Sequence, residues 1–357
     1  QFHQGLMVLP NAPKAWWRAF RKSLESWNNP AKREEYLRDN IEALQMADGR
    51  LHIGSTEMTS GYRAGGTIDK AIGSSPIAGR LTDKFQAGFD TFGDVARVEM
   101  FKVFMKAIDD GKVAIDDVCN HINKMTGITS SRALGVGATQ RELESAMISL
   151  APQYLRSTTA LMADAIQILT PKLRKGGKFF GWDVQARFES KQAVYALTRF
   201  FGATVLAYVG ISLALGQPLR LDPRKKSEGG DGAQFMSMVI DGQVVGLGSK
   251  PYSIARKAIA AAMAFEQDKP GEAFGQLWSF FRGQTAPLTS TMIDNITGEN
   301  FMHEPVQTFG ERLTNVSSRL LPYWVEAAIL DDPKPSGFGT TADFMGLRGW
   351  PLDYKDI

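Results

Sequence analysis

An uncharged stretch near the middle of the chain most constrains how the protein can fold. Residues 200–215 contain no charged side chain, and the stretch ends at Gly216 with Pro218 just beyond it. Because glycine favours helix ends and a helix cannot easily continue through proline, we expect one long helix over residues 182–217 that closes there. At about 1.5 Å per residue, the uncharged part would be about 24 Å long, just short of the ~30 Å hydrocarbon core of a bilayer.

The small residues of this stretch favour close packing, and two settings can use them. Glycine, alanine and serine let helices approach one another closely, both inside a protein and in lipid. The helix is therefore either the buried centre of a soluble helical domain, or a helix that enters a membrane or the core of an oligomer. In the second case, the membrane or oligomer-core contact would involve Phe200, Gly202, Leu206, Gly210, Ile211 and Leu215.

Positive charges gather at both ends of this helix, although the net charge of +3 does not by itself require a nucleic-acid partner. The two clusters are Lys172, Arg174, Lys175 and Lys178 before it, and Arg220, Arg224, Lys225 and Lys226 after it. Such clusters suit the phosphates of nucleic acid or of anionic lipid, while solvated loop charge is the commoner explanation. Phe179, Phe180 and Trp182 adjoin the first cluster, where they would insert beside gripped phosphates or simply anchor a basic loop to the core.

The remaining pattern predicts a mainly α-helical protein. With 43% hydrophobic and 22% charged residues among 357, the composition is that of a globular protein with a sizeable core. Apolar stripes predict helices over residues 13–27, 30–47, 112–127 and 139–170, and a further helix that Asp110-Gly111 stops. We expect a capping box at Thr139 to open the helix over 139–170, and Pro152 to kink it. Asp241-Gly242 between alternating residues predicts a single β-hairpin near residues 234–248.

Shifts in composition divide the chain into six segments and suggest an elongated multi-helix assembly. They are an N-terminal helical arm (1–48), a Gly/Ser-rich connection (49–80), a helical domain ending in the long apolar helix (81–217), a basic loop with the β-hairpin (218–250), a C-terminal helical region (251–330) and an extended tail (331–357). Residues 1–12 show no helical period. Because the chain begins at Gln1 without a secretory signal, we expect a portion of a longer polypeptide or a missing natural start.

No residue pattern indicates a catalytic or metal site. The single cysteine, Cys119, excludes a disulfide scaffold and has no nucleophile signature, so we expect it to pack as a small apolar residue. Asp117 and His121 would share one helix face, as metal ligands or, more commonly, as an ordinary surface pair. The fragment GVGATQ lacks the third glycine and the preceding strand of a dinucleotide loop. The sequence therefore predicts no enzyme, no cofactor and no metal.

Three stretches resemble a family of phage proteins. They begin INKMTG at Ile122, FFRGQT at Phe280 and LLPYWV at Leu320, and are similar to the C-terminal region of large polyvalent or internal virion proteins, within roughly residues 90–350. Members of that family are packaged in the capsid and ejected with the genome. The resemblance implies a homo-oligomer in the virion, in contact with other virion, portal or tail proteins and with genomic DNA.

The function implied by the resemblance is structural. It is an internal or ejection protein that helps to form a conduit for genome delivery through the host envelope, and that meets the host membrane after ejection. The alternative is a soluble structural component of the phage tail or portal region with no membrane role. An enzyme with an unrecognised site is a third class.

Overall fold

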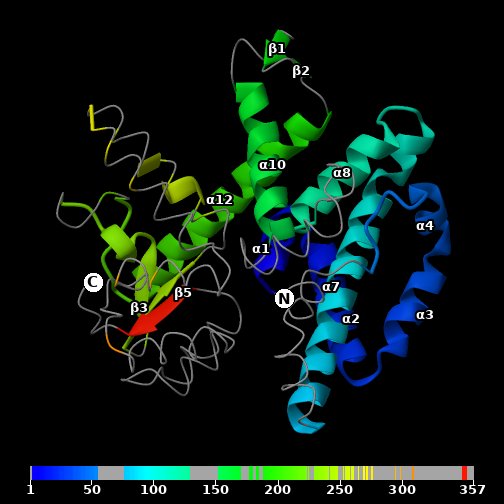
Figure 1. Ribbon diagram of the computed structural model, residues 1–357, viewed down its shortest axis with the longest axis horizontal. Helices are drawn as coiled ribbons and strands as arrows, with labels where there is room; N and C mark the ends of the chain where they lie inside the picture. Colours follow the sequence, from blue (N-terminus) through cyan, green and yellow to red (C-terminus); the bar gives the residue numbers. More distant parts are fainter. Residues whose placement is uncertain are drawn as a thin grey trace. The chain divides into compact units, whose positions relative to one another are not determined.

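The computed structural model describes a mainly helical protein, as the sequence predicts (Figure 1). The residues described are 2–54, 76–128, 152–169, 177–179, 182–184, 188–222, 224, 229–240, 242–247 and 348–351, with isolated positions between 252 and 308. The chain forms two compact units, Gln1–Glu142 with Ala151–Phe201, and Leu143–Leu150 with Gly202–Ile357. Each unit is described by itself below.

Four helices open the first unit. They are α1 (Phe2–Asn11), α2 (Pro13–Asn28), α3 (Ala31–Asp39) and α4 (Ile41–Ala47). α2 begins at a proline, whose missing N–H costs nothing in the first turn of a helix. The helix α1 was not predicted, because residues 1–12 show no helical period in the sequence. Met7 and Val8 of α1 are buried, so packing against the unit stabilises this short helix.

The helix α7 (Pro76–Asp109) is the longest of this unit, and its start lies within the predicted connection 49–80, of which residues 55–75 lie outside the described part. Its apolar stripe is buried and includes Phe92, Val95, Ala96, Val98 and Phe101. α2 packs along it (Figure 1). The helix stops at Asp110-Gly111 as predicted, where Gly111 has a φ of 67°, and α8 (Ile115–Met125) follows.

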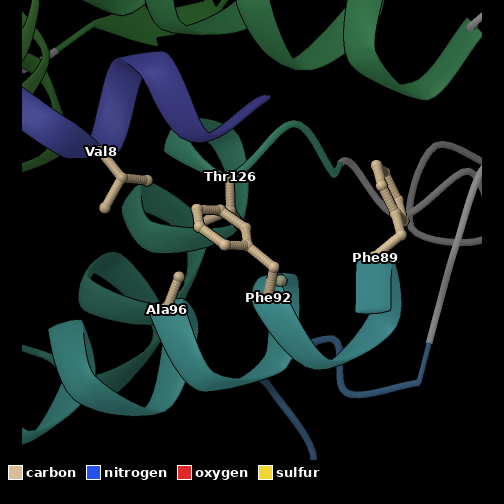
Figure 2. Close-up of a pocket in the computed structure, with 6 residues that line it drawn as sticks. Val8, Phe89, Phe92, Ala96 and Thr126 are labelled. Atoms are coloured by element: carbon tan, nitrogen blue, oxygen red, sulfur yellow. The ribbon is translucent and has the colours of Figure 1, made fainter. Parts of the chain in front are cut away.

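The contact between α1 and α7 is tightly packed. The Phe92 ring lies so close to Gly5 that a Cβ on that glycine would be 2.5 Å from the ring. The remaining space beside this ring is a cavity of about 10 Å³, with Val8, Ala96 and Thr126 among its lining residues (Figure 2). That volume is about one water molecule, so this cavity is too small for an organic ligand.

A buried ionic cluster holds residues 50–54 against α7 and α8. The Asp94 carboxylate, 1% exposed, accepts hydrogen bonds from Arg33 at 2.6 and 2.8 Å, from Arg97 at 3.0 Å and from the Gly54 N–H at 3.0 Å. Asn123 adds two backbone contacts, accepting from the His52 N–H and donating to the Arg50 carbonyl. Because each buried charge has polar partners, the cluster avoids the large cost of an isolated buried ion.

A second ionic contact joins three helices of the first unit. The Lys124 ammonium of α8 lies 2.6 Å from Asp164 of α10 (Pro152–Leu169) and 2.6 Å from Glu189 of α12 (Phe188–Ala214). Burial opposes the charge of Lys124, but the two carboxylates outweigh it and raise the Lys124 pKa. Between α10 and α12, β1 (Gly177–Phe179) pairs antiparallel with β2 (Trp182–Val184).

The second unit contains a three-stranded antiparallel sheet. β3 (Ser237–Ile240) pairs with β4 (Gln243–Gly246), and β4 pairs with β5 (Arg348–Pro351). A short 3₁₀ turn, η3 (Gly232–Gln234), precedes β3. The predicted hairpin at Asp241-Gly242 is confirmed, with Gly242 at a φ of 71° in the turn. Met238 and Val245, paired across the two strands, are buried on one face and Val244 is buried on the other, so this hairpin has the packing that a lone hairpin lacks.

Several features differ from the sequence-based prediction. The single helix predicted over residues 30–47 is divided into α3 and α4 at Asn40, whose backbone leaves the helical conformation. The long helix starts at Phe188 and not at residue 182, because Trp182–Val184 is a strand. The described residues contain two hairpins where one was predicted, and the predicted extended tail supplies β5 to the sheet that β3 and β4 form. Of the helix predicted over residues 139–170, the second half is α10, whereas the capping box at Thr139 lies outside the described residues. The helices predicted between residues 270 and 330 lie outside the described residues or are described only at isolated positions.

Candidate functional surface

The long helix α12 has an unusual distribution of charge and exposure. Its three charged residues, Glu189, Lys191 and Arg199, all lie in its first half. It is long and apolar enough to cross a membrane, and only 22% of its most apolar 18-residue window is buried. The core helix of a soluble protein passes the same test of length and composition but is mostly buried. Low burial therefore distinguishes α12 from an ordinary core helix.

Large apolar side chains of the second half of α12 are exposed to solvent. Leu206 is 74% exposed, Leu213 64% and Ile211 39%, and Leu215, just after the helix, is 47% exposed. Gly202 and Gly210 are also exposed, and no atom lies within 4 Å of where their Cβ atoms would be. Gly202, Leu206, Gly210 and Leu213 follow one another at spacings of four, four and three, which places them on one side of the helix, and we call these four residues the apolar face of α12. Adjacent exposed leucines of this kind mark a surface that another apolar surface covers.

The opposite side of the same half-helix is fastened within the second unit. Tyr208 is fully buried, and its hydroxyl oxygen accepts a 2.6 Å hydrogen bond from the Arg220 N–H. Beyond the helix end, the Gln217 amide accepts from the Val239 N–H at 2.7 Å and donates to the Val239 carbonyl. Gly216, at a φ of 65°, ends the helix as predicted. Only one side of this half-helix therefore faces solvent.

The first half of α12 belongs to a protein core. Ala193, Ala196 and Phe200 are at most 2% exposed and pack in the hydrophobic core of the first unit. Phe200, predicted as part of the membrane or oligomer contact, is therefore not on the apolar face. Gly202, Leu206, Gly210, Ile211 and Leu215, predicted with it, are all exposed. An uncharged run does not reveal where protein contacts end, which is why the sequence could not separate Phe200 from the others.

Most of the predicted phosphate-contacting cations lie outside the described residues. These are Lys172, Arg174, Lys175, Lys225 and Lys226. The Lys178 backbone is described and lies in β1, in register with Asp183 of β2. A part of the first basic cluster is thus carried by a two-stranded hairpin.

The other two predicted cations differ in their surroundings. Arg224 pairs with Asp222 through contacts of 2.5–3.0 Å, and this pairing lowers the pKa of the Asp222 carboxyl. Arg220 is half-buried, and its Nη1 atom is buried without a hydrogen-bond partner. Arg224 therefore already has a carboxylate in the place that a phosphate would take. Phosphate contact by these clusters stays a prediction.

The residues weighed for chemistry lie in the core. Cys119 is 1% exposed, and burial raises the pKa of its thiol to about 12, so the reactive thiolate is disfavoured. His121 is 4% exposed beside Phe188, and burial together with Lys124 lowers its pKa to about 4. The prediction that Asp117 and His121 form a surface pair is therefore wrong for His121, which is buried. In the described part of the chain no group of three or more residues could hold a metal ion.

Sequence reasoning missed several other exposed apolar residues. Leu213 lies seven positions after Leu206, so helical spacing could have placed it on the same face. Leu219 and Leu221, 42% and 47% exposed, follow the helix and alternate about Arg220, which is a period-two signal. Nothing in the sequence indicated that Tyr195 is exposed, because polar and apolar residues are mixed in the first half of α12. Its side chain is 60% exposed.

Comparison of the chain with protein-family models, with curated proteins and with solved structures finds no match.

Proposed function

We propose that this chain is a structural protein, and not an enzyme, which inserts the apolar face of α12 into a lipid bilayer. Following the resemblance of its sequence to internal virion proteins, we place this step in genome delivery by a phage particle, where several copies would help to form a conduit through the host envelope. The observation that carries the proposal is the exposure of Leu206 and Leu213, seven residues apart on one side of α12.

The energetics support an apolar environment for this surface. Transfer of a leucine side chain from water to an apolar medium gains about 1.5–3 kcal/mol when burial is complete. Leu206 and Leu213 lie on the same side of the helix, so both can gain from one apolar medium, and membrane binding strengthens with the apolar area that is buried. The charges of α12 lie at its other end, at Glu189, Lys191 and Arg199, so the apolar face can enter lipid without burying an ion.

Insertion of one side of the helix fits the geometry better than a free-standing span. Tyr208 and Ser212 are buried within the second unit, so lipid would reach only the opposite side of α12. The uncharged residues 200–215 would also measure about 24 Å, which is less than the ~30 Å of a hydrocarbon core. A helix lying in the interface, or several copies sharing a lipid-facing wall, meets both constraints.

The test is flotation with liposomes at about 1 M salt, where the Debye length of about 3 Å suppresses surface electrostatics. The variant combines Leu206→Gln with Leu213→Gln, which removes the apolar side chains without adding charge. Its matched control combines Val103→Gln with Ile41→Gln, because these residues are 73% and 53% exposed in the first unit. We expect the parent and the control to float and the variant to stay in the dense fraction.

Other results would decide against the proposal. A parent that does not float, or a variant that floats as well as its parent, removes the apolar face of α12 from any membrane role. Thermal unfolding of all three proteins, followed by circular dichroism, checks that each remains folded.

A second candidate function uses the same face for self-assembly without a membrane. The open surface at Gly202 and Gly210 favours it, since exposed glycines let a second helix approach closely. Sedimentation of the soluble protein at increasing concentration tests this candidate. If the parent forms oligomers that Gly210→Leu disrupts while flotation fails, the chain is a soluble structural component of the tail or portal region.

A further inference from the structure

We infer that the exposed side of α2 is a second membrane-contacting surface, which binds the anionic headgroups of a bilayer through Lys14, Trp17, Arg21 and Leu24. We call these four residues the basic-aromatic face of α2. They follow one another at spacings of three, four and three, which places them on one side of a helix. The inference rests on the first unit alone and does not require insertion of α12.

The fold leaves this side of α2 uncovered. The opposite side carries the small residues Ala15, Ala19, Ser23 and Ser26, all buried, which lets α2 lie close to α7. In contrast, Trp17 is 56% exposed and Leu24 is 50% exposed. Two large apolar side chains on the solvent side of a well-packed helix contribute little to the stability of this unit. Their place on the surface is better explained by a partner.

The charges on α2 identify the kind of partner. The helix carries four cations and a single acidic residue, Glu25. Arg18 is paired with Glu99 at 2.5 Å and Lys22 with Glu25 at 2.7 Å. Within the described part of the chain, Lys14 and Arg21 form no ion pair. The two cations that flank Trp17 are thus the ones available to an anionic surface.

The side chains match the layers of a bilayer interface. Tryptophan favours the boundary between headgroups and acyl chains, and the Trp17 ring is held in position by Phe20, with ring centroids 5.7 Å apart. Lysine and arginine near an anionic leaflet each add about 1 kcal/mol of attraction. Leu24 favours lipid over nucleic acid, because an aliphatic side chain gains from acyl chains but has no base to stack on.

The experiment measures binding of the full chain to phosphatidylcholine vesicles with and without phosphatidylglycerol, at about 0.1 M and about 1 M salt. The charge variant is Lys14→Glu with Arg21→Glu, and the apolar variant is Trp17→Ala with Leu24→Ser. A control of equal charge change is Lys106→Glu with Lys112→Glu, at exposed positions near the end of α7. All variants are also made with Leu206→Gln and Leu213→Gln, so that α12 insertion cannot mask the result.

We expect binding in that background to need phosphatidylglycerol and low salt. The charge variant should lose about tenfold or more in partition coefficient, the apolar variant should also bind more weakly, and the control should bind as its parent does. Brominated lipid should quench the parent more than Trp17→Phe, because Trp17 meets the acyl boundary.

Three results would overturn the inference. The first is vesicle binding that does not depend on anionic lipid. The second is an equal loss of vesicle binding in the charge variant and in the Lys106/Lys112 control. The third is a charge variant that loses binding to duplex DNA but still binds vesicles. Failure of α12 insertion is seen separately, as absence of flotation at high salt in the parent. Circular dichroism establishes that each variant is folded before its binding is compared.

Discussion

The core of the first unit and the second half of α12 use the same types of side chain in opposite ways. Leu161 of α10 is 1% exposed, whereas Leu206 of α12 is 74% exposed. α7 buries Val95, Val98 and Phe101 against its partners, while the second half of α12 presents Leu206 and Leu213 to solvent. Apolar content therefore indicates which segments are stable in an apolar environment. Only the contacts in the structure show whether the protein itself buries them.

The largest expected effect separates the two leucines. Leu161→Ala should lower the free energy of unfolding by about 2–5 kcal/mol, because it leaves a cavity in a packed core. Leu206→Ala should change it by no more than about 0.5 kcal/mol, since no packing is lost at an exposed position. Urea unfolding of both variants makes the measurement. Similar losses at the two positions would mean that Leu206 is covered within a single chain.

The next effect concerns pH and is confined to the core. Burial, with a smaller contribution from Lys124, lowers the pKa of His121 to about 4, against about 6.5 in an unfolded chain. The unfolded state therefore binds this proton more readily, and stability should be complete above about pH 6.5 and fall towards pH 4, by up to about 3 kcal/mol.

Urea unfolding across this pH range, for the parent and for His121→Leu, checks the assignment. The variant should lose the part of the pH dependence that lies between 6.5 and 4, while the apolar face of α12 contributes nothing to it. An identical slope in both proteins would assign the acid sensitivity to other groups.

The smallest effect uses one substitution at two glycines. Gly5→Ala should destabilise the protein by about 1–3 kcal/mol, because the new methyl group would overlap the Phe92 ring. Gly210→Ala should stabilise it by about 0.5–1 kcal/mol, because the site is open and alanine is the better helix former. Thermal unfolding measures both. Equal signs at the two sites would contradict the contrast between a packed and an open helix face.

Local signals predicted much of the fold. Gly216 with Pro218 ended α12, Asp110-Gly111 ended α7, and Asp241-Gly242 formed a hairpin turn, since each depends on backbone preferences of one or two residues. β5 could not be predicted, because pairing of the tail with β4 joins positions far apart in the sequence. β2 was mistaken for the start of a helix, since three residues are too few to show a period.

The candidate surface was predicted in composition but not in extent. Leu206, Ile211 and Leu215, which were predicted as membrane or oligomer contacts, are exposed, while Phe200, predicted with them, is buried. The exposure of Trp17 had no signal either. A tryptophan at a helical spacing usually faces a core, and only the small residues of α2 that pack on α7 show that this one faces away.

One consequence follows from the place where the two compact units divide. The division falls after Phe201, inside α12, so a single uninterrupted helix supplies residues to both. A polypeptide ending at this boundary would break the helical hydrogen bonds that cross it and fray the turn that buries Phe200. The protein is therefore not modular at its own domain boundary. Any fragment meant to fold alone, and any recombination that keeps both units intact, has to carry the whole of α12.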